Sequence, residues 1–178
     1  RERLRDTLEL TEAEATWRLP VPEKPVLSIN RGFSAPVVLV RPETAAERAF
    51  LLAHDTDAFT RSEAARGMAL ACLVEGADPA PFAEALGRAL ADETADPAFR
   101  ALLLALPGEE ELHREIAQGG EPVDPDAVHA RAETVKAALA EALAPILLVL
   151  HARMDVPGPY SPDAESAGRR ALRNAALG

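Results

Sequence analysis

Hydrophobic residues recur at spacings of three and four over most of the chain. The longest such series begins after Asp124, and its spacing predicts one long amphipathic helix. Its apolar members are Val128, Ala132, Val135, Leu139, Leu143, Ile146, Leu150 and Met154. Residues 145–150 are apolar on every side, so we expect this half of the helix to be buried between neighbours. Pro145 predicts a kink there, because proline removes a helical hydrogen bond.

Capping residues predict where the helices begin. Thr44-x-x-Glu47 and Thr60-x-x-Glu63 each read as a capping box, in which the hydroxyl and the carboxylate bind free amides of the first turn. Other starts pair a capping residue with proline at the first helical position; these are Asp78-Pro79, Asp96-Pro97, Asp124-Pro125 and Ser161-Pro162. With a short helix near residues 109–116, the pattern predicts six or seven helices after Pro42.

The first 42 residues have a different pattern. Short runs rich in β-branched and apolar residues alternate in polarity and are separated by prolines, which predicts antiparallel strands. The runs cover residues 7–10, 15–19, 26–29 and 37–40. Four short strands form one half-buried sheet but no complete sandwich. We therefore expect partner strands in a longer chain, and we interpret residues 1–42 as a portion of a β-sandwich.

The predicted fold is mainly α: a short antiparallel β-sandwich portion at 1–42, then an α-solenoid-like helical array of ARM/HEAT type at 43–178. Short Pro/Gly connections between helices favour antiparallel pairs, although no fixed-period repeat is present. The chain opens at Arg1 without a methionine and stops at Gly178, directly after an amphipathic segment. We expect a piece of a longer protein, with the helical array truncated.

The composition of the chain limits the classes of partner that it can bind. The chain has 178 residues, of which 48% are hydrophobic, and its 19 Lys+Arg and 29 Asp+Glu give a net charge of -10. This balance argues against nucleic acid and anionic lipid, which need clustered cations. The apolar stretch 142–150 is shorter than the about 20 residues of a membrane span. A single cysteine, Cys72, forms no internal disulfide and fits a reducing compartment. We expect a cytoplasmic protein that binds neither membrane nor nucleic acid.

Histidines were considered as metal ligands. A zinc peptidase places two histidines one helical turn apart, with a glutamate after the first. His113 fails this test, because Arg114 follows it and Ala117 occupies the place of the second histidine. The other histidines, at positions 54, 129 and 151, have no partner at ligand spacing. We interpret all four as structural or exposed.

A covalent nucleophile is also not predicted. Gly32-Phe-Ser34-Ala-Pro36 is superficially like a nucleophile elbow, but Pro36 stands where that turn needs glycine. Cys72 lies on an apolar helix face with Met68 and Ala71, which is typical of a buried small hydrophobe. We predict no catalytic, cofactor-binding or metal-binding residue in this chain.

Two charged clusters have structural interpretations. Glu109, Glu110 and Glu111 open a helix and complement its dipole, with a calcium or basic-partner site as the alternative. The last helix carries a basic cluster, which we interpret as an ion-paired, solvated face opposite Asp163 and Glu165, with peptide carboxylate binding as the alternative. Its members are Arg169, Arg170 and Arg173.

Several segments together resemble one family. The most specific is the run from Ser28 to Val37, SINRGFSAPV, and it is followed in order by similar segments at 52–65, 96–100, 106–109, 124–125 and 172–177. These segments resemble bacterial aminopeptidase N, a family of zinc-dependent enzymes that remove amino-terminal residues from peptides. The similarity covers nearly the whole chain. One departure is Ser62, which stands where the family pattern has a tryptophan.

The resemblance implies the end of a β-sandwich domain followed by the start of a C-terminal helical domain. In this family a His-Glu-x-x-His helix and a later glutamate hold zinc, and a Gly-x-Met-Glu-Asn loop binds the substrate amine. Neither motif occurs here, so the resemblance implies zinc in the parent protein and none in this chain. It also implies a non-catalytic part that closes the substrate cavity over the catalytic domain of its own chain, with short peptides as substrates.

Two alternatives remain beside this interpretation. The chain could instead be a standalone helical-repeat module for protein interactions. A small autonomous hydrolase using Ser34 or His113 has no supporting triad or metal set. If the chain is a fragment, its unpaired strands and exposed apolar surface predict self-association in isolation.

Overall fold

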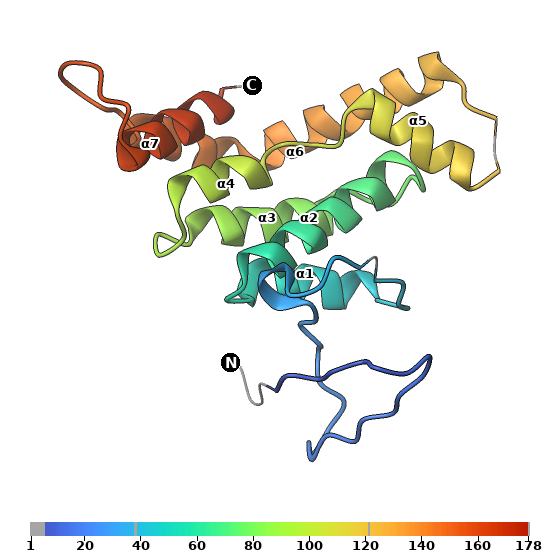
Figure 1. Ribbon diagram of the computed structural model, residues 1–178. Helices are drawn as coiled ribbons and strands as arrows, with labels where there is room; N and C mark the ends of the chain where they lie inside the picture. The colour runs from blue at the N-terminus through green and yellow to red at the C-terminus, as the bar shows by residue number, and fades with distance from the viewer. Residues whose placement is uncertain (1–5, 38, 121, 178) are drawn as a thin grey trace.

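The computed structural model describes residues 6–37, 39–120 and 122–177, and the regular secondary structure in this part of the chain is helical (Figure 1). One short 3-10 turn precedes seven α-helices along the described sequence. The elements are η1 (Arg31–Phe33), α1 (Ala45–His54), α2 (Ala58–Leu73), α3 (Ala80–Ala91), α4 (Pro97–Leu103), α5 (Glu109–Gln118), α6 (Pro125–Arg153) and α7 (Ala164–Ala175). The helical-array part of the predicted fold class is therefore confirmed.

Half of the predicted helix starts are placed correctly. The Thr44 capping box is confirmed, with the Glu47 amide 3.1 Å from Thr44 Oγ1 and the Thr44 amide 2.9 Å from the Glu47 carboxylate. Asp96 and Asp124 also cap their helices as predicted, each accepting two amide hydrogen bonds.

Three starts differ from the prediction. The capping box at Thr60 was wrong: α2 begins earlier because Asp57 accepts the Thr60 amide at 2.9 Å, and Thr60 already lies in the first turn. The α3 helix has Pro79 at its N-cap position, one residue later than predicted, but the Asp78 carboxylate still accepts the Ala80 amide at 3.0 Å. The α7 helix is capped by Asp163 instead of Ser161, because the Asp163 carboxylate reaches the Ser166 amide at 2.8 Å.

The α6 helix contributes the predicted apolar stripe to the core. Six members of the stripe are buried, namely Val128, Ala132, Val135, Leu139, Leu143 and Leu150. Ile146 and Met154 are partly buried against the same core. Pro145 lies inside the helix without ending it. Helical periodicity is a local property, which is why this stripe could be predicted from sequence alone.

The second half of α6 is not enclosed as predicted. Leu148 is 69% exposed and Val149 is 46% exposed, so burial on all sides was wrong. The elements that contact α6 are α2, α3, α5 and α7, and none of them covers these two side chains. The α6 helix is also long and apolar enough to cross a membrane. Its most apolar 18-residue window has a mean hydropathy of 1.7, and 22% of that window is buried. The core helices of soluble proteins meet the same criteria.

The helices form layers in which neighbours in space are not always neighbours in sequence. The α1 helix packs on α2 and α3, and α3 packs on α6 (Figure 1). The α4 helix packs chiefly against α7, while α5 contacts the other end of α6. The α4–α7 contact is close: a Cβ placed on Gly168 would lie 3.2 Å from the Ala98 amide nitrogen.

The β-sandwich portion is not shown by the structure. Apart from η1, the described residues 6–37 and 39–43 have no regular secondary structure, and none of the four predicted strands forms among them; Val38, inside the fourth, lies outside the described residues. A strand is stabilised by hydrogen bonds to a neighbouring strand, and these runs do not pair with one another. Trp17 and other apolar side chains of this segment are exposed.

Candidate functional site

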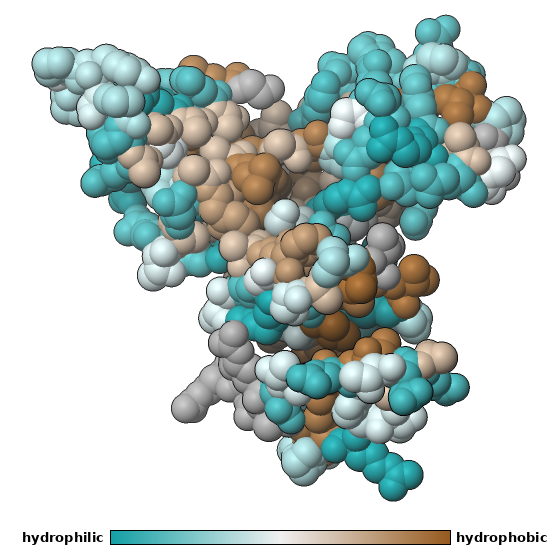
Figure 2. All heavy atoms as spheres, viewed as in Figure 1, coloured by the Kyte–Doolittle hydropathy of each residue, from teal (hydrophilic) through white to brown (hydrophobic). Residues whose placement is uncertain are grey.

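An apolar groove lies between α2, α4 and the segment that follows α4. Figure 2 shows apolar residues gathered over this region, in the hollow between α7 and α5. The groove has a volume of about 250 Å³. Its lining includes Phe82, Leu103, Leu106 and Pro107, and Leu102 at its edge is 57% exposed. This volume is below the about 300–1,000 Å³ that is typical of small-molecule pockets.

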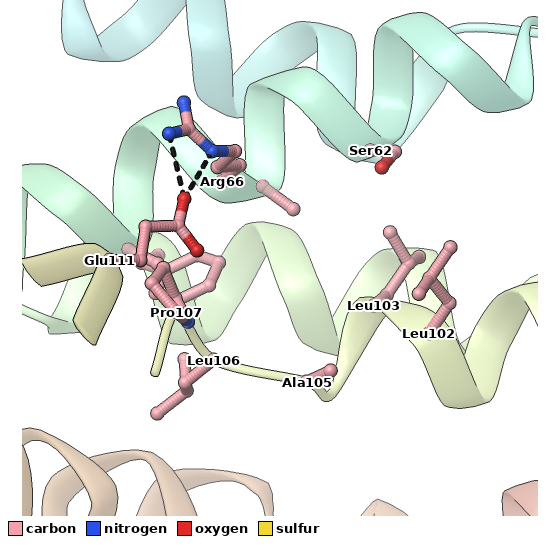
Figure 3. A pocket seen from close by; sticks show the side chains of 11 residues that line it. Ser62, Arg66, Leu102, Leu103, Ala105, Leu106, Pro107 and Glu111 are labelled. Atoms are coloured by element: carbon pink, nitrogen blue, oxygen red, sulfur yellow. Dashed lines mark hydrogen bonds and ion pairs between the residues drawn. The ribbon is translucent and has the colours of Figure 1, made fainter. Parts of the chain in front are cut away.

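One side of the groove carries a charged contact between two helices. Arg66 on α2 donates to Glu111 on α5 at 2.7 Å (Figure 3). It also donates to Glu115 on the same helix, at 2.9 Å. Burial acts to lower the pKa of Arg66, but the hydrogen bonds that it donates to both carboxylates outweigh this effect and raise the pKa. The guanidinium therefore links two helices that are distant in sequence, and Ser62 adds a hydroxyl to the groove.

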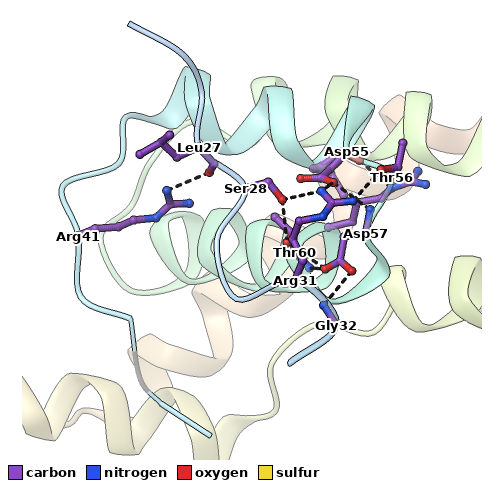
Figure 4. Close-up of polar contacts among 11 residues, drawn as sticks. Leu27, Ser28, Arg31, Gly32, Arg41, Asp55, Thr56, Asp57 and Thr60 are labelled. Carbon is purple, nitrogen blue, oxygen red and sulfur yellow. Dashed lines mark hydrogen bonds and ion pairs between the residues drawn. The ribbon is translucent and has the colours of Figure 1, made fainter. Parts of the chain in front are cut away.

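A second polar cluster occupies the corner between α1 and α2. Arg31 of η1 donates to Ser28 at 2.8 Å, to Asp55 at 2.6 Å and to Thr56 at 2.7 Å (Figure 4). The Asp55 side chain is 3% exposed. Its burial acts to raise its pKa, but hydrogen bonds from Ser28, the Asp57 amide and Arg31 together lower the pKa.

Two buried arginines bind helix ends in the core. Arg61, 5% exposed, donates to the Leu52 carbonyl at 3.1 Å and to Asp92 at 2.9 Å. Arg100, 4% exposed, donates to the Leu90 carbonyl, and burial lowers its pKa. The carbonyls at a helix C-terminus have no helical partner, so these cations satisfy them. We assign both arginines a structural role.

The structure keeps the predicted candidate residues apart. Cys72 is buried on its helix, as predicted, and burial raises the pKa of its thiol. His54 stacks near Phe50, with the two rings 5.1 Å apart. His129 bonds Glu109 at 2.9 Å on the surface. Among the residues the structure describes, no three His, Cys, Asp or Glu side chains gather closely enough to hold a metal ion, so these residues do not fit a zinc site.

The basic cluster on α7 has partners other than those predicted. Arg169 donates to the carbonyls of Arg153 and Asp155, both at 2.8 Å. Arg170 donates to the Ser161 carbonyl and lies 4.7 Å from the Tyr160 ring. Arg173 forms an ion pair with Asp155 at 2.7 Å. The cluster thus ties α7 to the α6–α7 connection, whereas Asp163 and Glu165 were the expected partners.

Sequence reasoning missed the roles of the arginines in both clusters. Arg31 and Asp55 are 24 residues apart, and Arg66 and Glu111 are 45 residues apart. No local spacing rule connects such residues. The available signal was the Asp-Thr-Asp run at 55–57 directly before a helix, which predicts a polar turn with caps.

Comparisons with known proteins identify the helical part. Residues 45–178 match a family described as "Domain of unknown function (DUF3458_C) ARM repeats". The chain belongs to this DUF3458_C family. The ARM-repeat architecture agrees with the helical array seen here and with the predicted α-solenoid class.

Named relatives of this DUF3458_C chain are aminopeptidases. It is 45% identical over 182 residues to the aminopeptidase N of Caulobacter vibrioides, covering 97% of this chain and 21% of that protein. It is 31% identical to the aminopeptidase N of Escherichia coli strain K12, covering 96% of this chain and 20% of that protein. The chain thus spans about a fifth of the length of these relatives. The predicted resemblance to a segment of aminopeptidase N is confirmed.

A solved structure shares the fold. The crystal structure of Legionella pneumophila aminopeptidase A in complex with aspartic acid superposes with a TM-score of 0.72 at 23% identity. The match covers 87% of this DUF3458_C chain and 19% of the other. At this identity the match establishes the fold alone.

Proposed function

We propose that this chain is a non-catalytic part of a zinc-dependent aminopeptidase N, whose catalytic domain removes amino-terminal residues from peptides. The observation that carries the proposal is the 45% identity to the Caulobacter enzyme over 97% of the chain. An alignment of that extent includes most of residues 1–44, which precede the DUF3458_C match. The similarity therefore spans both the N-terminal portion and the helical array.

Residues 1–42 contribute strands to a β-sandwich in the longer protein. The described residues of this portion expose large apolar side chains, among them Leu10 at 63% and Trp17 at 43%. Alternating apolar residues without partner strands are typical of a sheet that is completed by other chain segments. The boundary with the helical array falls near Arg41-Pro42.

The helical array closes the substrate cavity over the catalytic domain of the same protein. The chain as a whole has a net charge of -10, and an acidic lining would suit a cavity that receives the amino groups of short peptides. We assign the zinc to the catalytic domain of the longer protein, as the resemblance to aminopeptidase N implies. The parent enzyme resides in the cytoplasm, in keeping with a single, buried cysteine.

The test compares this chain with the whole protein encoded by its gene. The whole protein should bind zinc stoichiometrically and release the chromophore from an aminoacyl substrate, and a chelator should abolish release. This chain alone should do neither. Turnover by the isolated chain, or an inactive whole protein whose gene lacks a His-Glu-x-x-His motif, would contradict the proposal; the latter result would favour a standalone interaction module.

A further inference from the structure

The run from Ser28 to Val37 is the most specific sequence motif of the chain, and the proposed function does not use it. In the structure, residues 28–33 lie against the corner between α1 and α2 (Figure 4). The corner consists of residues 55–57 together with Phe59 and Thr60 at the start of α2. Contacts between the run and the corner involve an ion pair, hydrogen bonds and an aromatic contact.

The charged contact is largely withdrawn from water. Arg31 is 20% exposed at its side chain and Asp55 is 3% exposed, with 2.6 Å between the guanidinium and the carboxylate. The same guanidinium also reaches Ser28 and Thr56. A buried carboxylate that loses its cation is strongly destabilised, so Asp55 depends on Arg31. Ser28 bonds the corner as well, with its hydroxyl 3.2 Å from that of Thr60.

The backbone of the run is shaped to fit this corner. Asn30, Gly32 and Phe33 have positive φ angles of 57°, 64° and 53°. Left-handed backbone at a bulky residue such as Phe33 is strained and persists only where surrounding contacts hold it. The Gly32 amide donates to Asp57 at 2.9 Å, and the Phe33 ring lies 5.1 Å from the Phe59 ring.

The run is also braced internally. The Asn30 side chain accepts the Ala35 amide at 2.8 Å and donates to the Ala35 carbonyl at 3.0 Å. Elsewhere the N-terminal portion makes a different kind of ionic contact with the array: Lys24 pairs with Glu47 at 3.2 Å, but its side chain is 83% exposed. An exposed pair of this kind contributes little to stability. Arg41 also pairs with Glu43, whose side chain is 18% exposed. Among the ion pairs that the described residues form between the two portions, the one at the corner has the most deeply buried carboxylate.

We propose that the α1–α2 corner is a docking site for residues 28–33, and that this contact fixes the orientation of the N-terminal portion on the helical array. Arg31 is the positioning residue, because one guanidinium joins the run to Asp55 and Thr56. Asp57 holds the backbone of the run and caps α2 with the same carboxylate. This proposal concerns the geometry of the chain and does not depend on aminopeptidase activity.

Hydrogen exchange on the full 178-residue chain tests the proposal. Arg31→Ala should raise amide exchange at residues 28–35 about tenfold or more, while protection in α3 and α6 stays unchanged. Trp17 is the only tryptophan of the chain, and its fluorescence anisotropy should decay faster as the N-terminal portion gains motion. If Arg31 instead stabilised the whole fold, Arg31→Ala would raise amide exchange throughout the helices.

Two further variants keep the test decisive. Thr56→Val removes one exposed acceptor of Arg31 and should raise exchange at 28–35 about two- to tenfold in a chain that stays folded. Lys24→Ala is the matched control, since it removes the exposed pair with Glu47 and should leave that exchange unchanged. Unchanged exchange at 28–35 in Arg31→Ala and Thr56→Val would overturn the proposal, as would an equal effect of Lys24→Ala.

Discussion

Arg61 is a buried cation that binds the C-terminal end of a helix. Its guanidinium binds the Leu52 carbonyl and Asp92, and it lies 5.5 Å from the Phe99 ring. Arg61→Met keeps an apolar stem but leaves Asp92 without its cation and the α1 end without a donor. Asp92 is 31% exposed and keeps its hydrogen bonds from Thr94, so we expect the free energy of unfolding to fall by about 1–3 kcal/mol, measured by urea denaturation.

Arg88→Ala is the control for this measurement. Arg88 forms an exposed pair with Glu84 one helical turn away. Such pairs contribute about 0.3–0.5 kcal/mol, so the urea midpoint should barely move. If Arg61→Met and Arg88→Ala lowered the free energy of unfolding equally, the buried contacts of Arg61 would contribute no more to stability than an exposed ion pair.

At the level of elements, the contact between α4 and α7 depends on Gly168. A Cβ at this position would lie 3.2 Å from the Ala98 amide nitrogen and 3.5 Å from the Ala98 Cβ. Gly168→Ala should push the two helices apart and lower the free energy of unfolding by about 1–3 kcal/mol, despite the higher helix propensity of alanine. Thermal and urea unfolding followed by circular dichroism measure the change.

Gly87→Ala provides the contrast on α3. Its Cβ would meet only the end of the Leu143 side chain, at 3.4 Å. That side chain can shift, so the gain in helix propensity should dominate and leave stability equal or up to about 1 kcal/mol higher. A loss as large as that of Gly168→Ala would contradict this assignment of the close contact.

The N-terminus of α7 should respond to acid. Hydrogen bonds from the Ser161 hydroxyl and the Ser166 amide lower the pKa of Asp163 from 3.8 to about 2. Because the pKa is lower in the folded chain, the carboxylate stabilises α7 fully above about pH 4, and this contribution is lost as the pH falls toward 2. The protection factor of the Ser166 amide, which is its exchange rate relative to the unfolded chain at the same pH, should therefore fall in that window.

The variant Asp163→Asn distinguishes the effect of the negative charge at the cap from the effect of the capping hydrogen bond. Asparagine still accepts an amide hydrogen bond at the cap but does not titrate. Between pH 4 and about 2, the loss of Ser166 protection that is expected in the unsubstituted chain should be absent from this variant. An acid response identical in both chains would place the titrating group elsewhere.

The sequence predicted those features of the helices that depend on residues close together in the chain, and it missed those that depend on distant residues. The α6 stripe and the caps at Thr44, Asp96 and Asp124 depend on residues within a few positions, and they were predicted correctly. The exposure of Leu148 depends on which helices cover it, and the N-terminal strands depend on partners that the described residues do not supply. The groove was not predicted either, because its walls come from α2, α3, α4 and the segment after α4.

At the scale of the whole molecule, the exposed apolar surface predicts self-association of the isolated chain. Leu148 and Val149 lie together on α6, and their side chains are 69% and 46% exposed. Burial of such surface between copies releases water and opposes the repulsion of the negative charge. Sedimentation velocity should show an apparent mass that rises with protein concentration and with salt.

Leu148→Glu should reduce this association without unfolding the chain, because the side chain points to solvent. Val40→Glu is the matched control, since Val40 is 94% exposed but belongs to the N-terminal portion. A larger reduction by Val40→Glu would move the contact to the unpaired N-terminal segment. A chain that stays monomeric at all concentrations would refute the prediction.

The pairing of α4 with α7 has a consequence for the order in which the chain acquires its structure during synthesis. Helices α1, α2 and α3 can pack as soon as they leave the ribosome, because each has a partner close by in sequence. The α4 helix ends at Leu103, whereas its main partner begins at Ala164. Helices α2 and α3 also contact α4, but the face of α4 that packs against α7 stays uncovered until residues 164–175 have emerged, so the nascent chain exposes that face over the whole interval between the two helices.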